Sequence, residues 1–436
     1  MGEVMSLTPA LPGMFGRSSS FYNVISDIVR DRRLIHKIDS RILNHDLTKN
    51  SRMTLWERFG FNVLVGVICG SEVATHEISR AMIDFPEVVT NRIFQFNEFV
   101  EVYARVYVES GQSNKVTGQI ASAVKNDFGF APLAHEMSIA KNYYDMGLRV
   151  NFTDLGDEER FDFLISNGDI DVAVECKCIQ SDTGLPIKNH CVDLAYIGMR
   201  DTIINNRDIF SNSAIMFDIE SPISSPESLS ELLDSAADRR IGVGGSISNE
   251  NARMIIFDKA DAFSTDNSLP IVDTTKMLQE HIYRKYGTSM FTGFIPDIQS
   301  IDIGIPAICI CSKYVSADHS KRVLDELKKD ARKQLPLSSN SVMAIRFAEM
   351  SPKTEDKVFN DETDFPHLHA LASELFHSER AGHLGGVIFV GNPRYREANI
   401  LGPAGIRPTV GNRHSRWFAN DQHPRLAEIK AALGWS

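Results

Sequence analysis

The stretch Arg160-Phe-Asp-Phe-Leu-Ile-Ser-Asn-Gly-Asp-Ile-Asp-Val-Ala-Val-Glu-Cys-Lys-Cys-Ile179 decides the fold of this chain. It holds two runs rich in aromatic and β-branched residues, 160–165 and 170–179, which favour β-strands. The Ser-Asn-Gly-Asp segment between them is a strong signal for a tight hairpin turn. The stretch therefore predicts two antiparallel strands.

Two further elements are predicted just before this hairpin. Leu148-Arg-Val-Asn-Phe-Thr153 is a candidate strand. A helix begins at Pro132, continues with apolar residues at helical spacing and ends at Gly147. We expect a helix followed by a three-stranded meander in this region.

The last predicted strand carries two charged residues on one face. Glu175 and Lys177 are two residues apart, so their side chains leave the same side of the sheet. Charged residues on an otherwise apolar, buried strand are costly unless they bind a ligand or pair with each other. The other side of the strand is an apolar row formed by Val172, Val174, Cys176 and Cys178.

The hairpin brings a carboxylate to the charged face. A turn centred on Asn167-Gly168 places Asp162 opposite Ala173, on the face of Glu175 and diagonal to it. Two carboxylates and one lysine then converge on one patch. Carboxylate oxygens suit a hard divalent cation that keeps some of its water, and the cation lowers the pKa of that water. A neighbouring ammonium stabilises developing negative charge.

Two other acidic residues precede the charged pair. Asp169 lies in the turn, where a turn-forming role is expected. Asp171 shares the face of Glu175 but lies further along the strand. It stays a second candidate for a metal ligand.

The order helix, strand, strand with Asp162, strand with Glu175-x-Lys177 resembles the core of the PD-(D/E)xK nuclease superfamily. This superfamily includes many type II restriction endonucleases and Holliday-junction resolvases. The resemblance covers about residues 130–215, and Phe161 stands where the family's name has a proline. It implies a restriction-endonuclease-like α/β fold with a central mixed sheet flanked by helices.

The resemblance also implies roles for particular residues. Asp162 and Glu175, with the backbone carbonyl of Cys176, would hold Mg²⁺ or Mn²⁺, and Lys177 would be the catalytic lysine. Many members add a glutamate from the first core helix, and Glu136 fits that position at the border of the apolar stripe. The implied activity is hydrolysis of phosphodiester bonds, in DNA rather than RNA.

The helix and strand that complete the core stay open. Proximity in the sequence favours the helix near 190–206 with the strand 213–219. Residues 328–335 and 342–347 also resemble the helix and strand that follow the lysine in many family members. In that case about 185–315 is an insertion, and a phosphate-binding edge would be lined by Lys329, Arg332 and Gln334.

The chain as a whole divides into three predicted regions. Residues 1–125 are mostly helical in pattern and are expected to form an accessory domain that binds substrate, a protein partner or a second copy of the chain. Residues 126–391 are expected to hold the α/β domain. Residues 392–436, with scattered Pro, Gly and Arg, are predicted to be an irregular tail.

Composition narrows the function classes. A net charge of −11 argues against nonspecific coating of nucleic acid, but it allows a nuclease with a local basic track. No apolar run approaches the roughly 20 residues that span a bilayer, and no signal peptide is visible, so a cytoplasmic protein is expected. The alternatives to a nuclease are a nuclease-like domain used only for binding nucleic acid or protein, and an unrelated α/β protein in which Glu175 and Lys177 form a structural ion pair.

Overall fold

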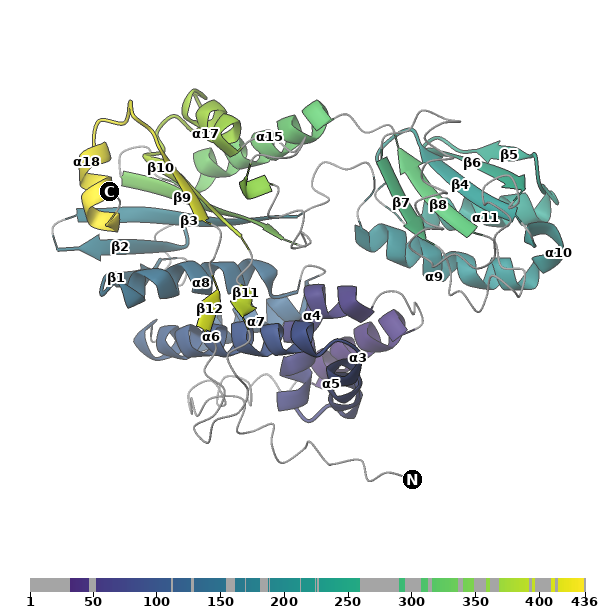
Figure 1. The fold of residues 1–436 in the computed structure, drawn as a ribbon, viewed down its shortest axis with the longest axis horizontal. Helices are drawn as coiled ribbons and strands as arrows, with labels where there is room; N and C mark the ends of the chain where they lie inside the picture. The colour runs from purple at the N-terminus through teal and green to yellow at the C-terminus, as the bar shows by residue number, and fades with distance from the viewer. Residues whose placement is uncertain are drawn as a thin grey trace. The chain divides into compact units, whose positions relative to one another are not determined.

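The chain forms α/β structure in two compact units, and the second interrupts the first (Figure 1). The second unit spans 182–322, and the first comprises the chain on either side of it. The computed structural model describes residues 32–46, 52–110, 113–126, 129–153, 161–168, 170–180, 187, 189–211, 213–223, 225, 227–258, 290–294, 307–312, 316–335, 340–348, 358–360, 368–391, 394–396, 409–411 and 415–434.

The first unit is built on a mixed sheet with the strand order β1-β2-β3-β9-β10-β13. The first three strands form an antiparallel meander, β9 and β10 continue parallel to β3, and β13 closes the described edge antiparallel to β10. Every residue of β9 and β10 is buried, as expected for central strands covered on both faces. The strands are β1 (Arg149–Phe152), β2 (Phe163–Asn167), β3 (Ile170–Gln180), β9 (Asn340–Ala348), β10 (Gly386–Val390) and β13 (Ser415–Ala419).

Helices cover both faces of this sheet (Figure 1). One face packs against α8 (Ala131–Asp145), with the other N-terminal helices behind it, and the opposite face packs against α15 (Ser316–Gln334) and α17 (Leu368–Phe376). The N-terminal helices are α3 (Arg32–Asp46), α4 (Arg52–Ile68), α5 (Glu72–Asp84), α6 (Pro86–Ser110) and α7 (Ser113–Lys125).

The N-terminal helices share one hydrophobic core with the sheet. This core runs from Leu34 in α3 through Val174 in β3 to Leu433 in α18 (Leu426–Leu433). The arrangement differs from the separate accessory domain expected for residues 1–125, because α6 packs against α8, α8 packs against β1 and β3, and the other helices continue the same core.

The expectation of an irregular tail after residue 392 is wrong. Ser415–Ala419 forms β13 of the main sheet, and α18 buries Ile429 and Leu433 against the core. A second short ribbon pairs β11 (Arg394–Arg396) with β12 (Thr409–Gly411). Pro, Gly and Arg in this region suggested a loop. The short strands form here because each pairs with a neighbouring strand, which the local composition does not reveal.

The hairpin forms as predicted, but its register is two residues away from the expected one. Asn167 pairs with Ile170, and Leu164, not Asp162, lies opposite Ala173. Gly168 has a φ of +66°, the left-handed conformation that a tight hairpin turn requires. A shift of two residues preserves the face of every paired side chain. Asp162 precedes β2, however, and Phe161 and Leu164 pack into the same core cluster, so the alternation of the strand does not extend to Asp162.

The strand that follows β3 in the sheet is β9, which pairs with β3 from Val172 to Gln180. The interpretation that the helix near 190–206 and the strand 213–219 complete the core is wrong. These residues form α9 (Asn189–Asn205) and β4 (Ser213–Ile219), which belong to the second unit. Proximity along the chain gave the wrong prediction, because the residues that follow β3 in the sequence fold into a separate compact unit.

The second unit has its own sheet and core. Its strand order is β5-β6-β4-β8-β7, and one face packs against α9 and α11 (Glu227–Asp238). The short α10 (Arg207–Phe210) follows α9. The strands are β4, β5 (Ser246–Ser248), β6 (Ala252–Asp258), β7 (Met290–Phe294) and β8 (Ala307–Ser312). Across the described parts of both units, no helix is long and apolar enough to cross a membrane.

Candidate active site

The candidate site lies where β2 separates from β3. Their pairing stops at Phe163, and one residue earlier Oδ2 of Asp162 accepts a hydrogen bond of 2.6 Å from the backbone N–H of Cys176. The carbonyl of Asp162 still accepts a hydrogen bond of 3.0 Å from the N–H of Thr153, just after β1. The Asp162 carboxylate thus satisfies a backbone donor of β3 that the departing β2 leaves behind.

The backbone of Cys176 presents its carbonyl at the same edge. In a strand the N–H and C=O of one residue point to the same neighbour, so the Cys176 carbonyl is directed toward the side on which Asp162 lies. This position agrees with the ligand role that the resemblance implies for that oxygen.

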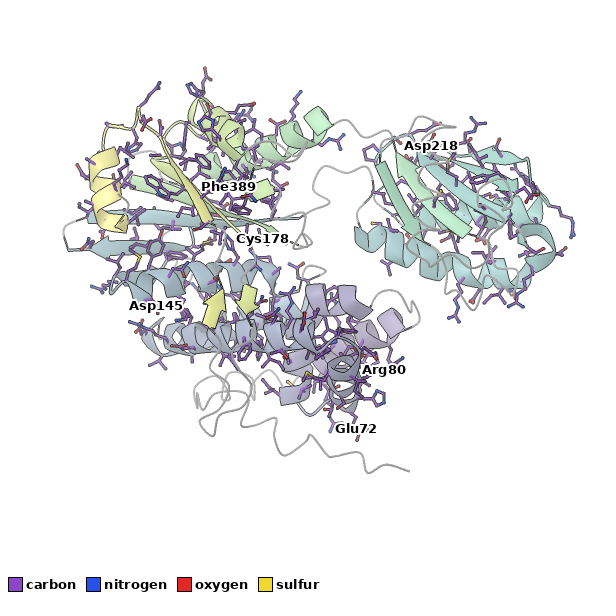
Figure 2. All side chains as sticks on the ribbon, viewed as in Figure 1. Glu72, Arg80, Asp145, Cys178, Asp218 and Phe389 are labelled. Carbon is purple, nitrogen blue, oxygen red and sulfur yellow. The ribbon has the colours of Figure 1, made fainter. Side chains whose placement is uncertain are left out.

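Glu175 and Lys177 lie on the sheet face covered by α15, as the period of the strand predicted. The Glu175 side chain is 1% exposed, and its Oε1 lies 2.8 Å from Nζ of Lys177. The same ammonium lies 3.4 Å from Oδ2 of Asp330 in α15. Figure 2 labels Cys178, the residue that follows Lys177 in β3.

The positive charge of Lys177 is stabilised by the neighbouring carboxylates. Burial by itself would lower the pKa of the ammonium, but the nearby carboxylate of Glu175, with smaller effects of Asp330 and Asp162, raises it above its ordinary value. Lys177 is therefore a cation throughout the neutral pH range. It is suited to stabilising negative charge and unsuited to accepting a proton.

Glu136 extends from α8 toward the same strand. Burial raises the pKa of the Cys176 thiol well above its usual range, and the negative charges of Asp162, Glu136 and Glu175 raise it further. All three carboxylates therefore act on the Cys176 thiol. Glu136 does so from a half-buried position on α8, which covers the sheet face opposite to that of Glu175 and Lys177. The Cys176 side chain is therefore a neutral thiol.

A buried histidine positions α8 against the sheet. His135 is 1% exposed, and its Nε2 donates a hydrogen bond of 3.0 Å to the carbonyl of Ala344 in β9. Burial, with a smaller effect of Arg346, lowers the pKa of His135 to about 3, so its ring is neutral. Because His135 precedes Glu136, this contact also fixes where Glu136 meets the sheet. The sequence offered no signal for it, since Ala344 is more than two hundred residues away.

The residues predicted on α15 divide between two sides of the helix. Lys329 and Arg332 are exposed, whereas Gln334 is half-buried with an Oε1 that is shielded from solvent. Asp330, which contacts Lys177, was not singled out in the sequence. It follows the buried Leu327 by three residues, and this helical spacing is a signal that would have placed it on the side facing the sheet.

Asp171 lies away from this site. It is exposed at the turn end of the hairpin, where its carboxylate accepts a hydrogen bond from the hydroxyl of Ser166. Four residues of strand separate it from Glu175, which corresponds to about 13 Å at 3.3 Å per residue. The structure therefore removes Asp171 from the candidate ligands.

The donor atoms fit a hard divalent cation in kind. They are carboxylate oxygens of Asp162 and Glu175 and the backbone carbonyl of Cys176, and Mg²⁺ often takes only one or two carboxylates and keeps several waters. Among the described residues, no three His, Cys, Asp or Glu side chains form a group that could hold a metal ion. Glu175 instead contacts Lys177, so a cation that used Glu175 would compete with that ammonium.

Comparison with models of known protein families, with curated proteins and with solved structures finds no match for this chain.

Proposed function

We propose that the chain is a divalent-metal-dependent nuclease with a restriction-endonuclease-like core, acting on phosphodiester bonds in DNA rather than RNA. The observation that carries this proposal is that Asp162 binds the backbone N–H of Cys176, between Glu175 and Lys177, where β2 separates from β3. Glu175 pairs with Lys177, and the charge of Asp162 also acts on that ammonium. The order α8, β1, β2, β3, α15, β9, with β9 parallel to β3, supports the same core.

The proposed roles follow from the charges at the site. Asp162, Glu175 and the Cys176 carbonyl would hold Mg²⁺ or Mn²⁺, with Glu136 supplying further negative charge from α8. When bound, the cation lowers the pKa of a coordinated water and neutralises charge on the phosphoryl group. Lys177, kept cationic by its carboxylate neighbours, stabilises the negative charge of the attacking hydroxide and of the transition state.

The substrate is proposed to be held by local basic residues, because the chain as a whole carries a net charge of −11. Lys329 and Arg332 are exposed on the same helix that brings Asp330 to Lys177. Phosphate contacts from these two residues would add affinity that falls as salt concentration rises.

The direct test is cleavage of supercoiled plasmid, linear duplex, single-stranded DNA and RNA with Mg²⁺ or Mn²⁺. Asp162→Asn, Glu175→Gln and Lys177→Met are each expected to reduce the cleavage rate by about 100-fold or more. Asp171→Asn is the matched control in the same hairpin, and Lys141→Met is the matched lysine control on α8; both should retain the wild-type rate. Cleavage that survives all three site substitutions would remove this site from the proposal.

A second candidate function is a nuclease-like domain that binds nucleic acid or protein without cutting. The Glu175–Lys177 ion pair favours it, because a carboxylate already neutralised by an ammonium needs no metal. The two functions separate in one experiment. A binding module retains DNA in gel-shift assays without divalent cation and leaves every substrate intact when the cation is added.

A further inference from the structure

Lys177 lies between two carboxylates from distant parts of the chain. Its Nζ is 2.8 Å from Oε1 of Glu175 and 3.4 Å from Oδ2 of Asp330. The two acids differ in burial, since the Glu175 side chain is 1% exposed and that of Asp330 is 22% exposed. We propose that Asp330 is a positioning residue, which holds the Lys177 ammonium when Glu175 binds the metal ion. This inference rests on the proposed function.

The need for a second partner arises from the position of Glu175. A buried carboxylate requires a cation, and without metal Lys177 supplies it. A divalent cation on Glu175 takes over that role, and the ammonium then lies close to a like charge. Lys177 is itself largely buried, so an ammonium without a carboxylate partner would be costly. Asp330 offers that partner within a small side-chain movement.

The position of Asp330 is set by packing. The neighbouring residues Leu327 and Ala331 are both fully buried against the sheet face that carries Glu175 and Lys177. This packing fixes the helix face from which Asp330 reaches Lys177. Asp330 follows the inserted unit in the sequence, because the part of α15 after residue 322 belongs to the first unit.

The inference predicts a specific pattern of metal affinity. In Asp330→Asn, Glu175 is the one of these two carboxylates that still pairs with Lys177. Mn²⁺ must then displace the ammonium from Glu175 with no Asp330 carboxylate to receive it, and this displacement costs more free energy. The dissociation constant for Mn²⁺ should rise by about fivefold. Lys177→Met removes the competing ammonium and should bind Mn²⁺ more tightly than the wild type. In the Lys177→Met background, Asp330→Asn should change the dissociation constant by less than about twofold, because Asp330 acts through Lys177.

The experiment is isothermal titration of the full chain with Mn²⁺ alone, for the wild type, both single variants and the double variant. Asp330→Glu should restore the wild-type affinity, and Asp325→Asn, an exposed acid on the same helix, controls for a general loss of negative charge. Thermal unfolding of each variant tests whether the fold is retained.

Several results would overturn the inference. If Asp330→Asn weakens Mn²⁺ binding equally in the wild-type and Lys177→Met backgrounds, Asp330 acts on the metal ion directly, by contact or by its negative charge, and not through Lys177. Unchanged affinity in the single variant would also overturn it, while leaving the proposed nuclease function in place. If the wild type binds no Mn²⁺, or binds it equally well after Asp162→Asn and Glu175→Gln, the metal site and the role of Asp330 are overturned together.

Discussion

The carboxylate of Asp162 binds the backbone N–H of Cys176 at 2.6 Å, where β2 has left β3. One side chain thus performs two tasks at this point. It satisfies a strand donor that has lost its strand partner, and it places a carboxylate on the side of β3 toward which the Cys176 carbonyl is directed. Asp162 therefore has a structural role, as an acceptor for the Cys176 N–H, and a proposed chemical role, as a metal ligand.

Two substitutions at Asp162 should therefore have different effects on stability but the same effect on activity. Asp162→Asn keeps an oxygen that can accept from Cys176, so its unfolding free energy should stay within about 1 kcal/mol of the wild type. Asp162→Ala leaves the N–H without that acceptor and should cost about 1–3 kcal/mol. Both should lose metal-dependent cleavage. Urea unfolding and plasmid cleavage measure the two effects, and equal stability of the two variants would contradict the structural role.

Glu136 is expected to contribute to cleavage from α8. Its charge acts on the same point of β3 as those of Asp162 and Glu175, so Glu136→Gln should reduce the cleavage rate by about tenfold. Asp145→Asn is the matched control on the same helix, because Asp145 is exposed and pairs with Lys141 (Figure 2). Initial rates at saturating Mn²⁺ provide the measurement. A rate for Glu136→Gln equal to that of the control would exclude Glu136 from the site.

His135 should make stability fall on acidification. Its pKa is about 3 in the fold and about 6.5 when exposed, so above pH 6.5 both states hold a neutral ring and its contribution is constant. Below pH 6.5 the unfolded chain binds a proton that the folded chain does not. The unfolding free energy should then drop by about 1.4 kcal/mol per pH unit down to about pH 3.

The variant His135→Gln isolates this effect. Glutamine can still donate to the Ala344 carbonyl but does not titrate, so the difference in unfolding free energy between wild type and variant should depend on pH only below 6.5. Denaturant unfolding at several pH values measures it. A difference that stays constant between pH 4 and 8 would show that His135 is not buried as a neutral ring.

A side chain at Gly385 should require Ile429 to move. A Cβ at this position would lie 2.1 Å from Cδ1 of Ile429, which is fully buried where α18 packs on the sheet. Gly385→Ala should lower the unfolding free energy by about 1–3 kcal/mol through overpacking. Gly118→Ala in α7 is the control, because nothing lies within 4 Å of its Cβ and alanine favours a helix. A neutral result at Gly385 would show that α18 does not pack tightly.

The local elements around the site were predictable because their signals are local. The helix that became α8, the three strands and the face shared by Glu175 and Lys177 follow from helical spacing, turn residues and the two-residue period of a strand. The hairpin register was missed by two residues, since the Ser-Asn-Gly-Asp segment permits more than one turn. The even shift keeps the paired side chains on their predicted sides, but Asp162 lies before the first paired residue, where the strand period no longer applies.

The sequence by itself determined the charged strand, the hairpin that carries Asp162 and Glu136 on the preceding helix, because each depends on neighbours only a few residues away. Only the tertiary structure decided that β9 and α15 complete this core, that Asp330 meets Lys177 and that His135 holds Ala344. These contacts join segments separated by an inserted unit with its own core. Burial of apolar faces, and not position along the chain, selects which distant segments pack together.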